Sequence, residues 1–363
     1  MHKINTEKEG IDMGFSFKKS SLKRFLAAGL SAALLLATAA CGSSTDQASS
    51  SSSASSAASD EAVVNIGTMN LVNGDLIAQY EKYYEKELGV KVNIINFKSG
   101  KDVNTALAAG SVDITELGSA PTALGLSNGL DYKVFWVGDV IGKAESLAVK
   151  NDSGINSVAD LKGKKIATPF SSTSHYSLLQ ALKLAGLSES DVTILDLQPN
   201  DIYAAWQRGD IDAAYVWFPV LSELLKDGKV ITDSQQLAEQ GVLTADLNVV
   251  RSEYAEKHPD VVKKYVQAQI KANDIIFNDP DKAQTAVSSL LEISKDDAKK
   301  QLSEFKYLTA DEQLDYLANK IPEALKSTAD FLVSQNSIKE AASLDVLKSK
   351  VTDEFVKAAV ADK

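Results

Sequence analysis

Short apolar runs alternate with longer amphipathic stretches between residues 63 and 250. The short runs are rich in Val and Ile and are typical of strands, whereas the longer stretches repeat every three to four residues, as helices do. We expect strands at 63–67, 90–97, 111–115, 134–140, 146–149, 164–168, 192–195, 213–217, 228–231 and 247–250. We expect helices at 76–88, 102–109, 175–185 and 201–208, and one more opening at Gly118-Ser119-Ala120-Pro121 with Ser119 as its N-cap. This alternation predicts an α/β fold with largely parallel sheets.

The chain beyond Glu253 has the helical period almost throughout. We expect these C-terminal helices to pack on the strands nearest the N-terminus and to complete the first lobe. The middle of the chain then forms a second lobe. The expected division is 62–145 plus 247–363 for one lobe and 146–246 for the other. A hinge is then expected near Glu145 and Leu247, and small ligands commonly bind in the cleft between two such lobes.

The first 62 residues differ in composition from the rest of the chain. Basic residues at 18–24 precede an apolar run at 25–40, which is shorter than the ~20 residues that span a bilayer. This layout predicts a cleaved signal peptide at 1–40. The run ends at Cys41, the only cysteine in the chain, in a context that resembles a lipobox. Lipid attachment at Cys41 would anchor the protein on the outer face of the cell membrane, although an incidental thiol is the alternative. The Ser- and Ala-rich stretch 41–61 is predicted to be a flexible tether.

Charge and composition narrow the functional classes. The formal net charge is -11, and the first 40 residues are net basic, so the remainder is more acidic still and argues against a nucleic-acid partner. Outside the N-terminal region the only histidines are His175 and His258, and no Cys or His cluster has metal-ligand spacing. No glycine-rich phosphate-binding pattern is present. We therefore expect a monomeric binding protein without cofactor or metal, rather than an enzyme.

The most informative segment lies just before the predicted helix at 175–185. Four hydroxyl residues occur in succession from Ser171 to Ser174, and His175 follows. Unpaired backbone amides and the positive end of the helix dipole favour an anion at a helix start. Ordinary capping needs only one hydroxyl, so the extra ones predict ligand binding. We assign the anion to Ser172, Thr173, Ser174 and His175, with Ser119 offering a similar helix start on the other lobe.

A positively charged ligand group would need carboxylates or an aromatic face. Asp139 and Glu145 lie near the expected crossing between lobes, and Trp217 ends a strand. A carboxylate accepts charge-assisted hydrogen bonds from an ammonium, and Trp offers a cation–π surface. The alternatives are a turn cap for Asp139, a solvated hinge residue for Glu145 and a core position for Trp217.

Several long segments resemble the taurine-binding proteins of ABC importers. The matching stretches are 99–107, 138–145, 172–179 and 204–217, with weaker similarity continuing to 307–309. The resemblance implies a two-lobed periplasmic-binding-protein fold (type II) that closes on its ligand and delivers it to a permease powered by an ATPase. It further implies that the sulfonate lies at the helix starts and the amine towards Asp139, Glu145 or Trp217. Other aliphatic sulfonates, nitrate and thiamine precursors are the alternative ligands in the wider superfamily.

Overall fold

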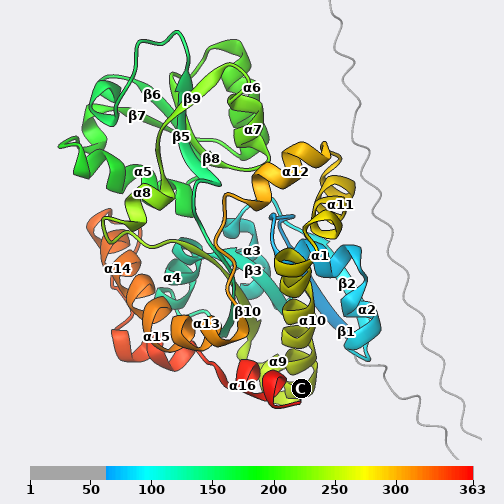
Figure 1. Ribbon diagram of the computed structural model, residues 1–363. Coiled ribbons are helices and arrows are strands. Elements are labelled where there is room, and N and C mark those ends of the chain that lie inside the picture. The colour runs from blue at the N-terminus through cyan, green and yellow to red at the C-terminus, as the bar shows by residue number, and fades with distance from the viewer. Residues whose placement is uncertain (1–62, 363) are drawn as a thin grey trace, which may run out of the picture. The chain divides into compact units, whose positions relative to one another are not determined.

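The computed structural model describes residues 63–362, which form two five-stranded sheets with helices packed around them (Figure 1). This is the two-lobed α/β architecture that the sequence predicts. The signal peptide at 1–40, the lipid attachment at Cys41 and the tether at 41–61 lie outside the described residues. None of the helices in 63–362 combines the length and the apolar character that crossing a bilayer would require.

The first sheet combines early strands with one much later strand. Its order is β2-β1-β3-β10-β4. The strands are β1 (Val63–Thr68), β2 (Lys91–Asn96), β3 (Ile114–Gly118), β4 (Tyr132–Val140) and β10 (Ala245–Arg251). β1 is parallel to β2 and β3, whereas β10 is antiparallel to β3 and β4. The chain must therefore return to this sheet after building the second one.

The second sheet consists entirely of strands from the middle of the chain. Its order is β7-β6-β8-β5-β9. The strands are β5 (Glu145–Lys150), β6 (Lys165–Thr168), β7 (Thr193–Asp196), β8 (Ala213–Trp217) and β9 (Gly228–Asp233). β6 is parallel to β7 and β8, whereas β5 is antiparallel to β8 and β9. Both sheets are thus mixed, and each buries its own apolar core.

A third segment lies beside the first crossing between the sheets. Val140 and Lys306 exchange backbone hydrogen bonds of 2.9 and 3.1 Å, and the Ala144 N–H donates to the Glu304 carbonyl at 3.3 Å. Gly142 lies against the same carbonyl so closely that a Cβ atom would collide with it. β5 begins at Glu145 and β10 at Ala245. The lobe boundaries drawn from the sequence, 145/146 and 246/247, stay a prediction.

The helices that precede β10 connect the strands of both sheets. They are α1 (Gly74–Tyr80), α2 (Tyr83–Glu87), α3 (Gly100–Ala108), α4 (Ser119–Ser127), α5 (Thr173–Leu184), α6 (Pro199–Arg208), α7 (Val220–Leu224) and α8 (Ser234–Ala238). Short 3-10 segments occur at Val158–Leu161 and Glu189–Asp191.

The helices that follow β10 pack mainly against the first sheet. They are α9 (Ser252–Lys257), α10 (Pro259–Asn278), α11 (Pro280–Leu291), α12 (Lys295–Leu302), α13 (Ala310–Asp315), α14 (Ile321–Ser334), α15 (Leu344–Lys350) and α16 (Glu354–Ala361), with a π-helical turn at Tyr316–Lys320. Tyr265 of α10 stacks on Tyr84 with ring centroids 4.8 Å apart. Gln301 of α12 also donates to Ser222 of α7 at 3.2 Å, which links the late helices to the second lobe.

Two of the predicted elements need correction. The helix expected at 76–88 is broken at Lys82, whose φ of 57° is left-handed, and therefore becomes α1 and α2. The strand expected at 111–115 begins only at Ile114, because the Ser111 N–H still bonds to the Ala106 carbonyl behind α3. The first error is a break inside a predicted helix and the second a shifted strand start, and in both the local backbone conformation overrides the apolar periodicity.

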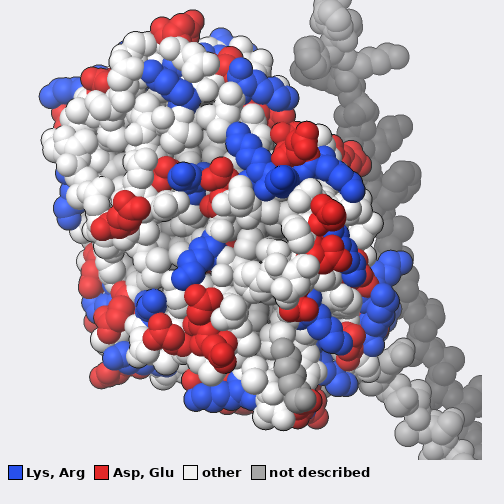
Figure 2. All heavy atoms as spheres, in the orientation of Figure 1, with Lys and Arg blue, Asp and Glu red and all other residues white. Residues whose placement is uncertain are grey.

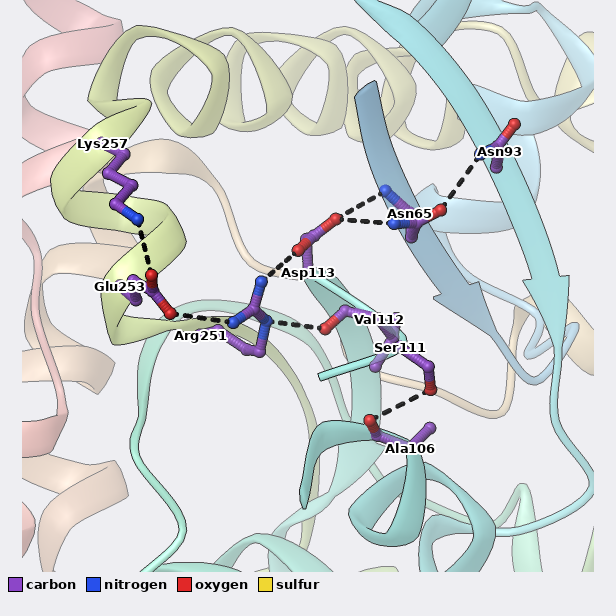
Figure 3. A network of polar contacts seen from close by, with 9 residues as sticks. All are labelled: Asn65, Asn93, Ala106, Ser111, Val112, Asp113, Arg251, Glu253 and Lys257. Carbon is purple, nitrogen blue, oxygen red and sulfur yellow. Dashed lines mark hydrogen bonds and ion pairs between the residues drawn. The ribbon is translucent and has the colours of Figure 1, made fainter. Parts of the chain in front are cut away.

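A polar network ties β1 to the ends of β3 and β10 (Figure 3). The Asp113 carboxylate accepts from Arg251 at 2.6 Å and from the main chain and side chain of Asn65 at 2.9 and 3.0 Å. Arg251 also bonds to the Val112 carbonyl at 3.2 Å and to Glu253 at 3.4 Å. Asp113 is 5% exposed, so the network fixes strand ends that water does not reach freely.

The surface carries charges of both signs. Figure 2 shows Lys and Arg side chains interspersed with Asp and Glu on the face in view. Many of them form exposed pairs, such as Lys257 with Glu253 and Lys326 with Asp330. Such exposed pairs contribute little to stability individually.

Candidate ligand-binding site

A cleft of about 430 Å³ lies where the two lobes meet. Its wall comes from the first lobe, the second lobe and the segments that join them. The lining residues are Met69, Leu71, Gly100, Gly118, Pro121, Ile141, Glu145, Ser172, Thr173, Trp217, Asp246 and Phe305. Its wall is mainly apolar and carries a few polar groups, as is typical of small-molecule pockets.

The start of α5 forms the hydroxyl-rich side of the cleft. Ser172 is the N-cap, in extended conformation, and its Oγ accepts from the His175 N–H at 3.1 Å and donates to the Pro169 carbonyl at 2.6 Å. The first backbone amides of a helix have no partner within the helix. Ser172 and Thr173 line the cleft, so the predicted anion-binding helix start faces a real cavity.

Hydroxyl groups of the second lobe hold Glu145 in place. Its carboxylate accepts from Thr173 at 2.5 Å, from Ser234 at 3.0 Å and from Ser177 at 3.4 Å. Burial raises the pKa of Glu145, and these hydroxyl hydrogen bonds oppose the rise. Glu145 is 1% exposed yet lines the cleft, and it is not the solvated hinge residue considered from the sequence. The Thr173 hydroxyl proton is already committed to this carboxylate.

Ser174 and His175 are buried or nearly so, but neither side chain is among those that line the cleft. The His175 ring stacks on Phe170, with centroids 4.4 Å apart, and its Nδ1 accepts from the Ser171 N–H at 3.4 Å. Burial lowers the pKa of His175 to about 4, so the imidazole is neutral at pH 7. The structure therefore does not bring these two predicted site residues to the cleft wall.

The start of α4 reaches the same cleft from the first lobe. Gly118 is the N-cap and Ser119 the first helical residue, which corrects the expected capping role of Ser119. The Ser119 hydroxyl instead accepts from the Ala245 N–H at 3.3 Å. A Cβ atom on Gly118 would lie 2.7 Å from the Thr173 methyl carbon. The glycine thus permits close contact between the starts of α4 and α5.

Two carboxylates stand opposite each other on neighbouring strands of the first sheet. Asp139 on β4 and Asp246 on β10 are paired residues in the antiparallel ladder, so their side chains lie on the same face of the sheet. Burial raises the pKa of Asp139 to about 7, and burial together with the neighbouring carboxylates raises the pKa of Asp246 well above its usual range. Asp246 lines the cleft, whereas the fully buried Asp139 lies behind it.

Asn73 connects this pair to another buried acid. Its side-chain amide donates to Asp139 at 3.0 Å and also to Glu116 of β3. Glu116 is fully buried, and burial raises its pKa well above the usual range, with further contributions from the negative charges of Asp75 and Asp139. Gly138 lies directly beneath Glu116, with 2.5 Å between a Cβ atom placed there and Oε1.

The remaining wall of the cleft is apolar. Trp217, at the end of β8, is partly buried and lines the cleft together with Met69, Leu71 and Phe305. Trp217 is therefore positioned to cover the aliphatic part of a ligand or to meet a cation with its ring face. No Lys, Arg or His side chain lines this cleft among residues 63–362.

The sequence signature of one family extends over residues 71–283 and is described as NMT1/THI5 like. The chain belongs to the NMT1/THI5-like family. This NMT1/THI5-like protein is 42% identical over 268 residues to the taurine-binding periplasmic protein of Escherichia coli, an alignment that covers 72% of this chain and 83% of the relative.

Solved structures share the fold of this NMT1/THI5-like protein. The periplasmic aliphatic sulphonate binding protein SsuA from Escherichia coli matches with a TM-score of 0.66 and 23% identity, covering 80% of this chain and 92% of that one. The desulfurization enzyme DSZB matches with a TM-score of 0.61 and 18% identity, covering 83% and 99%. At these identities the likeness shows a shared fold alone.

Sequence reasoning missed two acids of the NMT1/THI5-like protein, Asp246 and Glu116. A signal for Asp246 was present, because polar residues at 246 and 248 interrupt an otherwise apolar strand with the period of one sheet face. Phe305 gave no such signal. It comes from a segment between α12 and α13 that reaches the cleft only through its pairing with the crossing at Val140.

Proposed function

We propose that this protein is the substrate-binding component of an ABC importer and that it captures taurine in the cleft between its lobes. One observation carries the proposal: the same cleft has a hydroxyl-rich helix start on one side and buried carboxylates without a basic partner on the other. A zwitterion with a sulfonate at one end and an ammonium at the other matches both ends. The 42% identical relative, a taurine-binding protein, supports this ligand.

The sulfonate is assigned to the starts of α5 and α4. The unpaired amides of the first turn of α5 provide neutral donors, and the helix dipole favours negative charge there. Gly118 brings the second helix start within contact of Thr173. One tetrahedral anion could then contact both lobes at once, which would favour the closed form.

The ammonium is assigned to Asp246 and Glu145. Both line the cleft, and burial makes an unpaired negative charge costly at either position. An ammonium would supply the missing counter-charge and donate charge-assisted hydrogen bonds. Asp139 lies behind Asp246, so its role is to support that residue rather than to touch the amine directly.

Calorimetric titration with taurine tests the proposal. We expect saturable binding of one taurine per chain and a rise in melting temperature, because a ligand that binds only the folded state stabilises it. Ethanesulfonate, which lacks the ammonium, and ethylamine, which lacks the sulfonate, should each bind more weakly. Absence of heat and of thermal stabilisation with millimolar taurine would contradict the proposal.

A second candidate ligand is an aliphatic sulfonate with an uncharged tail. The apolar wall formed by Met69, Leu71, Trp217 and Phe305 favours it. This candidate requires ethanesulfonate to bind more tightly than taurine, and Glu145→Gln to cost little affinity. The taurine proposal requires the opposite on both counts, so the same two titrations distinguish the candidates.

The cellular setting is part of the same proposal. We assign the chain to the outer face of the cell membrane, held by lipid on Cys41, with a permease and an ATPase as partners. Metabolic labelling with a fatty-acid analogue should mark the wild type, and Cys41→Ser should lose both the label and the membrane association. The protein should release taurine chemically unchanged, which NMR of the recovered ligand can check, because we assign it no catalytic activity.

A further inference from the structure

Five buried carboxyl groups gather behind the ammonium side of the cleft. They come from five elements, and the ionisable groups that face them are tyrosines. The carboxyl groups are Asp75 of α1, Glu116 of β3, Asp139 of β4, Glu145 of β5 and Asp246 of β10, and the tyrosines are Tyr84, Tyr215, Tyr265 and Tyr307. None of the ion pairs formed within residues 63–362 includes one of these carboxyl groups. These five carboxyl groups therefore have no positively charged partner among the described residues.

Asp139 and Asp246 cannot both be ionised in this setting. They are direct partners across β4 and β10, where side chains approach within about 5 Å. Both are buried and neither pairs with a basic side chain among the described residues, and two carboxylates that share such a site force one of them to hold a proton. Asn73 already donates to Asp139, so it stabilises the ionised form of Asp139 and leaves the proton to Asp246.

The other acids are less suitable as the source of a mobile proton. Glu145 accepts from three hydroxyl groups, which favour its charged form. Asp75 accepts from Tyr265 at 2.9 Å and Gln79 at 2.9 Å, in a layer of the first lobe that does not line the cleft. Glu116 is fully buried, and one of its oxygens has no hydrogen-bond partner among the described residues. Of the five acids, only Asp246 both shares a proton with a neighbouring carboxyl group, that of Asp139, and lines the cleft.

We propose that a ligand ammonium arriving at Asp246 expels the proton that Asp139 and Asp246 share, so that ligand capture is coupled to proton release. The O–H bond of the carboxylic acid breaks, the proton leaves to bulk buffer, and the resulting carboxylate pairs with the ammonium. The net charge of the pair together with its ligand is thereby the same after binding as the charge of the pair before it. The inference rests on the proposed function, because it requires a sulfonate that carries an ammonium.

Titration calorimetry of the purified full chain at pH 7 tests this coupling. Taurine is titrated in phosphate and in Tris, two buffers that differ in their enthalpy of ionisation. The difference between the two observed enthalpies should correspond to release of up to about one proton per taurine. The affinity for taurine should strengthen by up to about tenfold per pH unit between pH 6 and 8. Ethanesulfonate should release no proton and should show no such strengthening.

Two variants locate the source of the proton. Asp139→Asn should diminish proton release and the pH dependence of binding, because Asp246 then loses the neighbouring carboxylate whose negative charge helps it to hold the proton. Asp315→Asn, at an exposed carboxylate of α13, should keep both properties. If Asp139→Asn does not fold, the wild-type measurements in two buffers still decide the question.

The outcomes separate this inference from the proposed function. Taurine binding with equal enthalpies in both buffers and a flat pH profile would overturn proton release and leave taurine capture intact. Proton release that persists undiminished in Asp139→Asn would also overturn it. No taurine binding at all would overturn both.

Discussion

Asp246 is a single acidic residue on a buried strand, and it contributes its side chain to the cleft wall. Within residues 63–362 no basic side chain lines the cleft, and we propose a ligand ammonium as the partner of the Asp246 carboxylate. The residue is also placed by its neighbours, since Asp139 is its partner across the ladder and Asn73 holds Asp139. In the proposed complex, Asp139 and Asn73 thus help to position Asp246 without contacting the ammonium themselves.

We expect Asp246→Asn to weaken taurine binding about ten- to a hundredfold, because a hydrogen bond to a charged group contributes about 1.5 to 3 kcal/mol. Ethanesulfonate affinity should change little or improve. Titration of both ligands measures the difference. Asp345→Asn, in the first turn of α15, provides a control outside the cleft. Equal losses for the two ligands would show that Asp246 maintains the structure of the cleft instead.

At the scale of elements, α5 contributes both its cap and its hydroxyl groups to the cleft, which allows a direct comparison with an ordinary helix start. Ser343 caps α15 in the same way, by accepting from the Val346 N–H at 3.3 Å. The two serines thus share their capping role, but only Ser172 lines the cleft.

Ser172→Ala and Ser343→Ala should each lower the free energy of unfolding by about 1 kcal/mol, the usual contribution of an N-cap. Only Ser172→Ala should also weaken taurine binding, by several-fold to tenfold, because its cap holds the helix start that lines the cleft. Chemical denaturation and calorimetry measure the two effects. An unchanged affinity in Ser172→Ala would mean that the hydroxyl group serves only as a cap.

The network in Figure 3 gives a second comparison, this time of a stabilising element far from the ligand. Asp113→Asn leaves the Arg251 guanidinium without its buried partner, so we expect a loss of about 3 kcal/mol of stability. Under conditions in which the variant is fully folded, its affinity for taurine should equal that of the wild type. Denaturation midpoints and titration separate the two readouts, and a large loss of affinity in folded protein would contradict this division of roles.

The sequence predicted the positions of helices and strands better than the long-range contacts between them. Apolar periodicity located β1, β2, β6 and β8 closely, and the hydroxyl run before α5 indicated a real helix start in the cleft. The left-handed residue Lys82 could not be foreseen, because lysine has no preference for that conformation. The Asp139–Asp246 pair depends on strand register, and Phe305 depends on a long-range bridge to Val140. Local patterns carry no information about such distant pairings.

For the molecule as a whole, the buried acids make stability depend on pH. Burial raises the pKa of Asp75, Glu116, Asp139, Glu145 and Asp246, so the folded state holds protons that the unfolded chain releases. Their stabilising contribution is complete below the carboxyl pKa of the unfolded chain and is lost as pH rises through the folded pKa, about 7 for Asp139. His175, with its pKa lowered to about 4, acts in the opposite sense, but only between about pH 4 and 6.5.

The free energy of unfolding without ligand should therefore fall between pH 6.5 and 8, where His175 is neutral in both states. Each proton lost corresponds to about 1.4 kcal/mol per pH unit, and we expect a total loss of about 2 kcal/mol. Urea denaturation at a series of pH values measures it. A stability that rises over this interval would contradict the protonated state of the buried acids.

The backbone bridge between Val140 and Lys306 limits how the two lobes can move. A single connecting segment would allow one lobe to rotate relative to the other about the axis of that segment. Here the segment between α12 and α13 lies alongside and is hydrogen-bonded to it at Val140 and Ala144, so twisting would break these bonds whereas bending would keep them. We therefore expect the cleft to open by hinge bending without twist. The starts of α4 and α5 would then return to the same alignment each time the cleft closes.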